Sequence, residues 1–193
     1  MYIAIEGIDT AGKSTQIALL KEAFNDAIIT KEPGGTDMGT RIRDIVLHRE
    51  IQSSKAEFLL FLADRAEHMC QVIEPNSNSV IISDRSVISG VAYALVKGDL
   101  SETAIVHMNR FATNGVYPSK VFLLQLTPAE LEYRLSQKKL DGIEKRGTEY
   151  LLSIQEALVK AAQLLKVELV IIDATQSIEA ISNTIITNIK EYE

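Results

Sequence analysis

The chain has 193 residues, of which 46% are hydrophobic and 24% charged, and its formal net charge is −6. This balance is typical of a globular protein with a hydrophobic core, and the length fits one domain, so we expect residues 1–193 to form a single domain. The acidic charge argues against a broad nucleic-acid surface, and no apolar run approaches the ~20 residues that a membrane helix needs. No signal peptide precedes the first apolar run. The sequence therefore predicts a cytoplasmic protein with neither nucleic acid nor a membrane as a partner.

Apolar, β-prone runs alternate with stretches of helical periodicity along the whole chain. This alternation predicts an α/β fold, a three-layer sandwich in which helices cover both faces of a five-stranded parallel sheet. The predicted strands are residues 2–5, 27–30, 80–83, 121–126 and 168–172. The predicted helices are residues 13–24, 38–47, 54–73, 87–96, 102–113, 128–138, 149–166 and 178–189.

A phosphate-binding loop follows the first predicted strand and opens the first predicted helix. Its sequence fits G-x-x-x-x-G-K-[ST] in full, which predicts a P-loop that binds ATP. Glycines let successive backbone N–H groups point at phosphate oxygens, and the helix N-terminus adds partial positive charge. Lys13 is expected to reach the β- and γ-phosphates and Ser14 to ligate Mg²⁺. The predicted ATP-binding residues are Gly7, Ile8, Asp9, Thr10, Ala11, Gly12, Lys13, Ser14 and Thr15.

The helix predicted over residues 54–73 has an apolar stripe that we expect to face the core. Its members are Leu59, Leu62, Ala63, Ala66, Cys70 and Ile73. At 3.6 residues per turn, Phe61 and Arg65 lie four residues apart on a second face, turned away from that stripe. An aromatic ring beside an arginine suits a flat base that carries a carbonyl group, although a Phe packed against a neighbouring helix would give the same pattern.

Cys70 and the three histidines carry no further prediction of a site. Cys70 is the only cysteine, so an intrachain disulfide is impossible, and its place in an apolar pattern predicts a small buried hydrophobic residue. His48, His68 and His107 are scattered singly, without Cys or carboxylate neighbours at ligand spacing, which argues against a dedicated zinc site.

The third predicted strand ends in Asp84-Arg85, an acid after an apolar run as in a Walker-B strand. Asp84 is expected to hold the metal partly through water, and Arg85 to bridge the transferring phosphates. A strand-end ion pair is the alternative. The guanine motif N-K-x-D is absent, and D-x-x-G occurs only inside the P-loop, so a GTPase switch is poorly supported.

Several motifs resemble the thymidylate kinase family, in its order and spacing, across nearly the whole chain. They are the P-loop, Glu32-Pro33-Gly34-Gly35-Thr36, Phe61 with Arg65, Asp84-Arg85-Ser86, Ala92-Tyr93, and Leu140-Asp141 with Ile143-Glu144. The resemblance implies a kinase that transfers a phosphoryl group from ATP to dTMP, with Mg²⁺ as cofactor, in a homodimer.

The resemblance also assigns roles at the acceptor site, residue by residue. Phe61 would stack on the pyrimidine and Arg65 would donate to its O4. Arg43 would grip the acceptor phosphate, whereas Arg41 suits a solvated face. Tyr93 would lie beneath the deoxyribose. The dTMP-binding residues that it implies are Asp9, Glu32, Pro33, Arg43, Phe61, Arg65, Arg85, Ser89 and Tyr93.

Three departures from the family pattern bear on these roles. Ser86 stands where the family commonly has Tyr, and Asp-Arg-Ser also occurs in deoxynucleoside kinases. Gly90 stands where the family often has Ser or Asn near the base, which removes a side-chain contact. The polar segment 136–148, a mobile LID or an ordinary surface loop, lacks the usual arginine-rich tip.

The P-loop carries Thr10 where one branch of the family has an arginine, so the missing cation is expected from the LID, as in the bacterial branch. Arg134 is the first candidate, and with Lys13, Arg85 and Asp9 it completes the predicted catalytic set. Arg146, Lys138 and Lys139 are the further candidates.

Two other functions share part of this pattern. A deoxynucleoside kinase would phosphorylate a 5′-hydroxyl and would need a general base, for which Glu32 is the obvious residue. A P-loop switch or ATPase would turn over ATP without regard to any acceptor.

Overall fold

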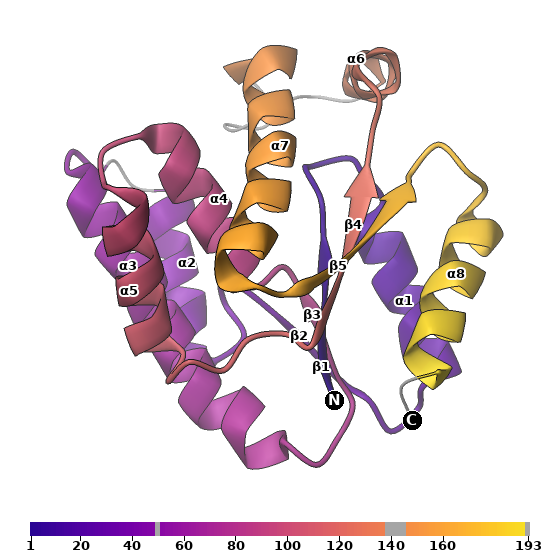
Figure 1. Cartoon of the computed structure of the whole chain (residues 1–193), viewed down its shortest axis with the longest axis horizontal. Helices are drawn as coiled ribbons and strands as arrows, with labels where there is room; N and C mark the ends of the chain where they lie inside the picture. Colours follow the sequence, from indigo (N-terminus) through magenta and orange to yellow (C-terminus); the bar gives the residue numbers. More distant parts are fainter. Residues whose placement is uncertain (49–50, 138–145, 192–193) are drawn as a thin grey trace.

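The computed structural model describes residues 1–48, 51–137 and 146–191, and its centre is a parallel sheet of five strands (Figure 1). The strand order is β2-β3-β1-β4-β5, and all of β1 is buried between its neighbours. The predicted fold class is confirmed, and each strand boundary lies within one residue of its predicted place. The strands are β1 Tyr2–Glu6, β2 Ile28–Lys31, β3 Ile81–Asp84, β4 Lys120–Gln125 and β5 Glu168–Asp173.

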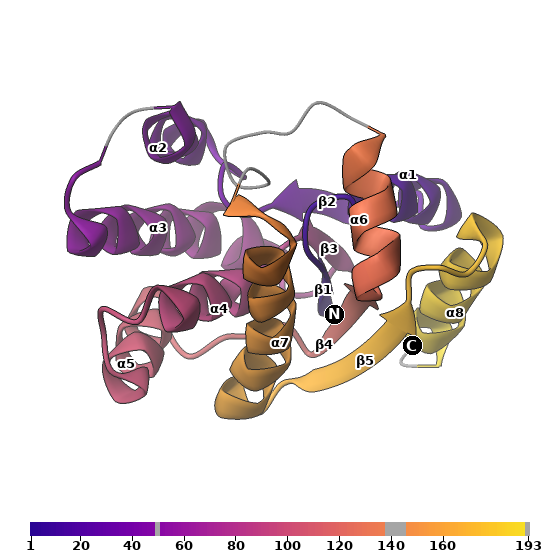
Figure 2. The ribbon, with the colours of Figure 1, turned by 90° about the horizontal axis from the view of Figure 1, so that it is seen from above.

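Helices cover both faces of the sheet. α1 packs with α8 on one face, and α4 packs with α7 on the other; α5, α3 and α2 form a further group beside α4 (Figures 1 and 2). No helix of the described residues is long and apolar enough to cross a bilayer. The helices are α1 Lys13–Ala23, α2 Asp37–His48, α3 Ser54–His68, α4 Val87–Lys97, α5 Glu102–Ala112, α6 Pro128–Ser136, α7 Thr148–Leu165 and α8 Ile178–Lys190.

Hydroxyl side chains fix where most of these helices begin. In each case the Ser or Thr before the first turn accepts a hydrogen bond from a backbone N–H of that turn, which satisfies a donor that the helix itself leaves free. The residues are Ser53, Ser86, Ser101, Thr127 and Ser177.

The region 54–73 differs from the predicted single helix. α3 ends at His68, and the chain continues through one π-helical turn at Met69–Ile73 and one 3₁₀ turn at Glu74–Asn76. Pro75 lies in this last turn, and its missing N–H is compatible with a helix end.

The predicted core-facing stripe of residues 54–73 was right for Leu62 and Ile73, which are buried, and wrong for its other four residues. Leu59 is 54% exposed, and Ala63, Ala66 and Cys70 are exposed as well, so Cys70 is not the buried residue that its pattern suggested. The buried face carries Phe58, Leu62, Asp64, Arg65 and His68. α3 packs mainly against α2, α4 and α5, and its three buried polar side chains pair with residues of β2, of the loop after β2 and of α5. An apolar stripe identifies a helix face but does not say what covers it.

Candidate active site

The P-loop joins β1 to α1 and folds around its own lysine. Gly7 has a φ of +149°, and a Cβ there would lie 2.8 Å from the carbonyl oxygen of Leu124, so the position requires glycine. Lys13 Nζ is buried and donates to the carbonyl oxygens of Gly7 (3.0 Å) and Ile8 (3.1 Å). Ser14 and Thr15 are exposed in the first turn of α1. The loop therefore presents an ammonium, hydroxyls and a helix N-terminus at one place, which suits a polyphosphate.

Lys13 is less basic than an ordinary lysine. Burial, together with the charge of Arg85, lowers the pKa of Lys13 to about 8, and Asp9 acts in the opposite direction. Asp9 Oδ1 lies 3.9 Å from the ammonium. A phosphate bound here would place a negative charge beside the buried ammonium and so favour its charged form.

Arg85 ties the end of β3 to the P-loop. Its Nη2 donates to Asp9 Oδ1 at 2.6 Å and its Nη1 donates to the carbonyl oxygen of Gly7 at 3.1 Å. Asp9 therefore lies between the two cations Lys13 and Arg85. The backbone of Arg85 has a φ of +66°, in the left-handed region that few residues other than glycine adopt. Such strain is typical of functional sites.

A buried carboxylate beneath Arg85 escaped the sequence analysis. Glu6, at the end of β1, accepts hydrogen bonds from Ser86 Oγ (2.8 Å), from Ser89 N (3.2 Å) and from Ser89 Oγ (2.5 Å). Arg85 Nη1 in turn lies 3.3 Å from Ser89 Oγ. Burial raises the pKa of Glu6, although Arg85 and the two serines oppose that rise. The signal in the sequence was an acid that ends an apolar strand, as at Asp84.

Ser86 has a local role that a tyrosine at this position could not fill in the same way. Its hydroxyl caps α4 by accepting from the N–H of Ile88 at 3.2 Å, and it donates to Glu6. Ser86, which stands where the family commonly has Tyr, therefore binds Glu6, the carboxylate that lies behind Arg85.

A cavity of about 740 Å³ opens beside the P-loop, between α3 and α4. The structure brings all nine of the predicted dTMP-binding residues to its wall. They are Asp9, Glu32, Pro33, Arg43, Phe61, Arg65, Arg85, Ser89 and Tyr93. Ser86, Gly90, Arg146 and Tyr150 also line it.

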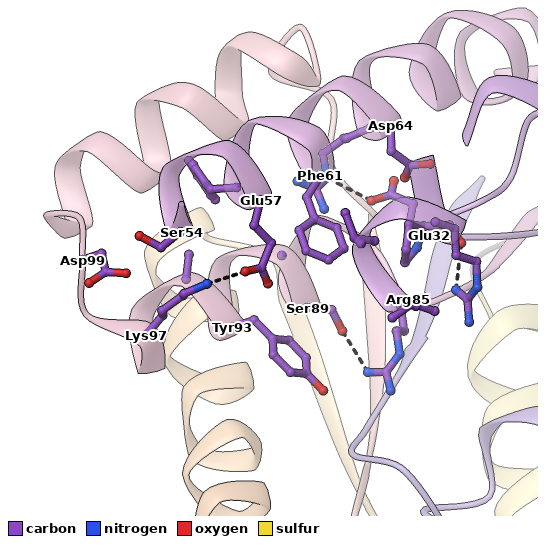
Figure 3. A pocket seen from close by; sticks show the side chains of 18 of the residues that line it. Glu32, Ser54, Glu57, Phe61, Asp64, Arg85, Ser89, Tyr93, Lys97 and Asp99 are labelled. Carbon is purple, nitrogen blue, oxygen red and sulfur yellow. Dashed lines mark hydrogen bonds and ion pairs between the residues drawn. The ribbon is translucent and has the colours of Figure 1, made fainter. Parts of the chain in front are cut away.

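Two aromatic side chains face each other across this cavity. Phe61 projects from α3 and Tyr93 from α4, with Ser89 near the gap between them and Arg85 to one side (Figure 3). Both rings are half-buried. Burial raises the pKa of Tyr93 to about 12, and Arg85 opposes the rise, so the phenol is neutral at physiological pH. The slot between the rings suits a flat, uncharged ring system.

Arg65 lies at one end of this slot and belongs to a buried polar network. Its Nε donates to Glu32 Oε2 at 2.9 Å and its Nη1 donates to Asn109 Oδ1 at 2.7 Å. His68 Nδ1 lies 3.0 Å from Glu32 Oε1, and Thr30 Oγ1 lies 2.6 Å from His68 Nε2. Burial alone would raise the pKa of Glu32, but Arg65 and His68 outweigh it and hold that pKa below its ordinary value. Both carboxylate oxygens of Glu32 are therefore engaged, and the group is a weak base.

The loop after β2 is anchored to α3 and α2. Gly34 N donates to Asp64 Oδ1 at 2.9 Å, and burial raises the pKa of Asp64 to about 6. Arg43 Nη1 donates to the carbonyl oxygen of Pro33 at 2.9 Å, and its side chain lines the cavity, whereas Arg41 is exposed. Asp64 and His68 were not predicted, because their partners come from β2 and the loop that follows it.

The cation candidates near the LID occupy different places. Arg134 donates to the carbonyl oxygens of Thr10 (3.0 Å) and Ala174 (2.7 Å), and to Glu130 Oε1 (2.6 Å), so it braces the P-loop from α6. Arg146 lines the cavity, where its Nη1 donates to Tyr150 Oη at 2.9 Å and its guanidinium lies 4.9 Å from that ring's centroid. Lys138, Lys139 and the motif residues 140, 141, 143 and 144 lie outside the described residues.

The residues predicted to hold Mg²⁺ fit that ion. Asp84 Oδ1, at the end of β3, is buried and has no hydrogen-bond partner among the described residues. Ser14 presents a hydroxyl at the start of α1. One carboxylate and one hydroxyl are too few for a protein-only magnesium site, but they suffice where nucleotide phosphates and water complete the shell.

A P-loop that adjoins an aromatic-walled cavity at the carboxyl edge of a parallel sheet defines a P-loop kinase with a nucleotide-sized acceptor site. The profile of the family described as thymidylate kinase matches residues 5–185. Three relatives named thymidylate kinase align with this chain over nearly the full length of both sequences. That of Sulfurimonas denitrificans is 71% identical over 98% of this chain and 99% of its own. That of Wolinella succinogenes is 54% identical (97% and 97%), and that of Aliarcobacter butzleri 51% (96% and 96%). The chain belongs to the thymidylate kinase family.

Proposed function

We propose that this protein transfers the γ-phosphoryl group of ATP to dTMP, giving dTDP and ADP, in the synthesis of dTTP. The observation that carries this proposal is the cavity beside the P-loop. Its aromatic walls suit a pyrimidine, Arg65 supplies donors at one end, and Asp9 with Arg85 connects it to the P-loop. The family membership of the whole chain supports the same acceptor.

The chemistry requires positioning and charge rather than a general base. A phosphate oxygen of dTMP attacks the γ-phosphorus, and the bond from that phosphorus to the bridging oxygen of ADP breaks. The second pKa of a phosphate monoester is near ~6, so this nucleophile is anionic at neutral pH. Two anions must meet, and Lys13 and Arg85 lie where they can offset the charge of both. Walls that exclude water limit wasteful hydrolysis of ATP.

A deoxynucleoside kinase fits this site less well. It would need a base to take the proton of a 5′-hydroxyl, and Glu32 was the candidate. Arg65 and His68 occupy both oxygens of Glu32 and hold its pKa low, so it is poorly suited to accept a proton.

Mg²⁺ is the proposed cofactor, held by Ser14 and by Asp84, the latter partly through water. When bound, it neutralises charge on the transferring phosphates. The unpartnered oxygen of Asp84 supports this assignment.

The LID cation stays a proposal. Arg134 is the first candidate, because it already contacts the P-loop at Thr10. Arg146 is the alternative, since it lines the acceptor cavity. A cytoplasmic location and a homodimer are further proposals.

A panel of acceptors tests the proposed reaction. ADP release is measured with ATP and Mg²⁺ in the presence of dTMP, dUMP, dCMP, dAMP, dGMP or thymidine. We expect dTMP to give the highest kcat/KM and thymidine to give none. Turnover of thymidine alone would indicate a deoxynucleoside kinase, and ADP release that ignores every acceptor would indicate an ATPase or switch.

A further inference from the structure

The guanidinium of Arg65 is fixed by a residue outside the cavity wall. Asn109 lies on α5, is fully buried, and accepts from Arg65 Nη1 at 2.7 Å. Its own Nδ2 donates to the carbonyl oxygen of Ile105 at 2.8 Å, which turns Oδ1 toward the arginine. Glu32 binds Nε from the other side at 2.9 Å. A long side chain that ordinarily has several rotamers is therefore held in one.

Gly90 supplies the space that the guanidinium occupies. A Cβ at residue 90 would lie 2.9 Å from both Cζ and Nη1 of Arg65, and closer still to Nη2. The far end of an arginine usually moves away from such a contact, but Glu32 and Asn109 hold this one. The Ser or Asn that the family often has at this position would not fit beside Arg65 in its present place.

The remaining nitrogen, Nη2, has no hydrogen-bond partner among the described residues, and Arg65 forms part of the cavity wall. We propose that Asn109 and Gly90 together form a seat for Arg65, and that this seat sets the preference of the acceptor site for a pyrimidine with a carbonyl at C4. The inference rests on the proposed role of Arg65 toward the base.

The selectivity follows from what a guanidinium can offer. All its polar hydrogens are donors, so it meets the 4-carbonyl of thymine or uracil with a hydrogen bond. Cytosine has a 4-amino group, which is also a donor, and one of the two buried donors would stay unpaired. Buried polar groups without partners are costly, and sites built on such groups discriminate strongly. A guanidinium free to turn aside would lose this discrimination, and the seat prevents that movement.

Asn109→Leu tests the seat, because leucine has a similar volume and no acceptor. We expect KM for dTMP to rise about 10-fold, with KM for ATP unchanged. The ratio of kcat/KM for dTMP to that for dCMP should fall by about 10-fold or more. Asn109→Asp keeps the acceptor and should restore most of the selectivity. Gly90→Ala approaches the guanidinium from the opposite side and should lower the same ratio, even if the leucine variant does not fold.

Thr113→Val is the matched control, since Thr113 is a buried polar residue of the same region whose hydroxyl interacts with the Arg110 carbonyl oxygen, at 3.5 Å, and with Tyr117, but not with Arg65. It should leave the ratio unchanged at comparable melting temperature. Folded Asn109→Leu and Gly90→Ala proteins that keep the wild-type ratio would overturn the seat. Arg65→Met tests the role of Arg65 itself, apart from the roles of Asn109 and Gly90. If this variant also keeps the wild-type ratio, the proposed role of Arg65 toward the base is wrong.

Discussion

The guanidinium of Arg85, which we propose acts on the phosphates, has a position that depends on the groups behind it. Arg85 Nη1 approaches Ser89 Oγ, and Ser89 Oγ donates to the buried carboxylate of Glu6. Because Glu6 accepts the hydroxyl proton of Ser89, that proton points away from Arg85, and Ser89 Oγ can accept from Arg85 Nη1. A displacement of about 1 Å at a reacting group can cost up to ~100-fold in rate, so this chain of hydrogen bonds bears directly on catalysis.

Glu6→Gln should therefore lower kcat by about 10- to 100-fold and leave both KM values within about twofold. The glutamine amide donates to Ser89 Oγ instead of accepting from it, while the side chain keeps its shape. Steady-state kinetics with dTMP and ATP measure the effect, and thermal melting reports whether the fold is intact.

Ser86→Ala provides the comparison, because it removes a different donor to Glu6 and leaves the link through Ser89 in place. It costs the cap of α4, about 1 kcal/mol of stability, but little rate. Equal losses of kcat in the Glu6 and Ser86 variants would show that the carboxylate serves the fold alone.

Lys13 gives the site a dependence on pH. Its pKa of about 8 in the free enzyme means that the ammonium is charged at pH 7 and loses its proton as the pH rises past 8. Bound phosphates favour the charged form, so ATP binding raises this pKa and takes up a proton. We expect the Kd for ATP to increase by several-fold between pH 7 and 9.

Isothermal calorimetry in buffers of different ionisation enthalpy measures both the Kd and the proton uptake. Lys13→Met, with no charge to lose, should bind ATP weakly at every pH and without proton uptake. A wild-type Kd that stays flat from pH 7 to 9 contradicts the lowered pKa.

At the scale of single elements, the strands and most helix ends were predictable because local signals define them. Apolar, β-prone runs predicted the five strands, and helical periodicity predicted each helix start to within one residue. The Ser or Thr caps that the structure shows at five of these starts are a local signal as well. The P-loop was equally local, since one strand, one turn and one helix build it.

The surroundings of α3 were not predictable in the same way. Its apolar stripe predicted the wrong face, because three polar residues of the other face are buried against partners from distant elements. Asn109 lies 44 positions from Arg65 in the sequence, and Glu32 lies 33 positions away. No periodicity within α3 encodes these pairings, although the prediction that Phe61 and Arg65 belong to one binding site is compatible with their common place in the cavity wall.

At the scale of the whole molecule, α3 has two different surfaces. One lines the acceptor cavity and carries Phe61 and Arg65. The other exposes Leu59, Ala63 and Ala66, at spacings of four and three residues, and Cys70 is exposed just beyond them in the π-helical turn. This spacing is the seam along which two helices pack, and the small residues let backbones approach closely. It supports the proposed homodimer, with α3 of a second copy as the occupant of the stripe.

Leu59→Glu should separate such a dimer, because it places two like-charged carboxylates in an apolar contact. Sedimentation velocity at matched concentration should then show a monomer where the wild-type chain is a dimer. Ile178→Glu is the control, since Ile178 is 49% exposed on α8, across the sheet from α3 (Figure 1). If Leu59→Glu sediments as the wild type does, the stripe is not the dimer contact. A further outcome is a monomer in which KM for dTMP rises while KM for ATP does not. That result would mean that contact between the two copies of α3 also stabilises the surface of α3 that lines the acceptor cavity.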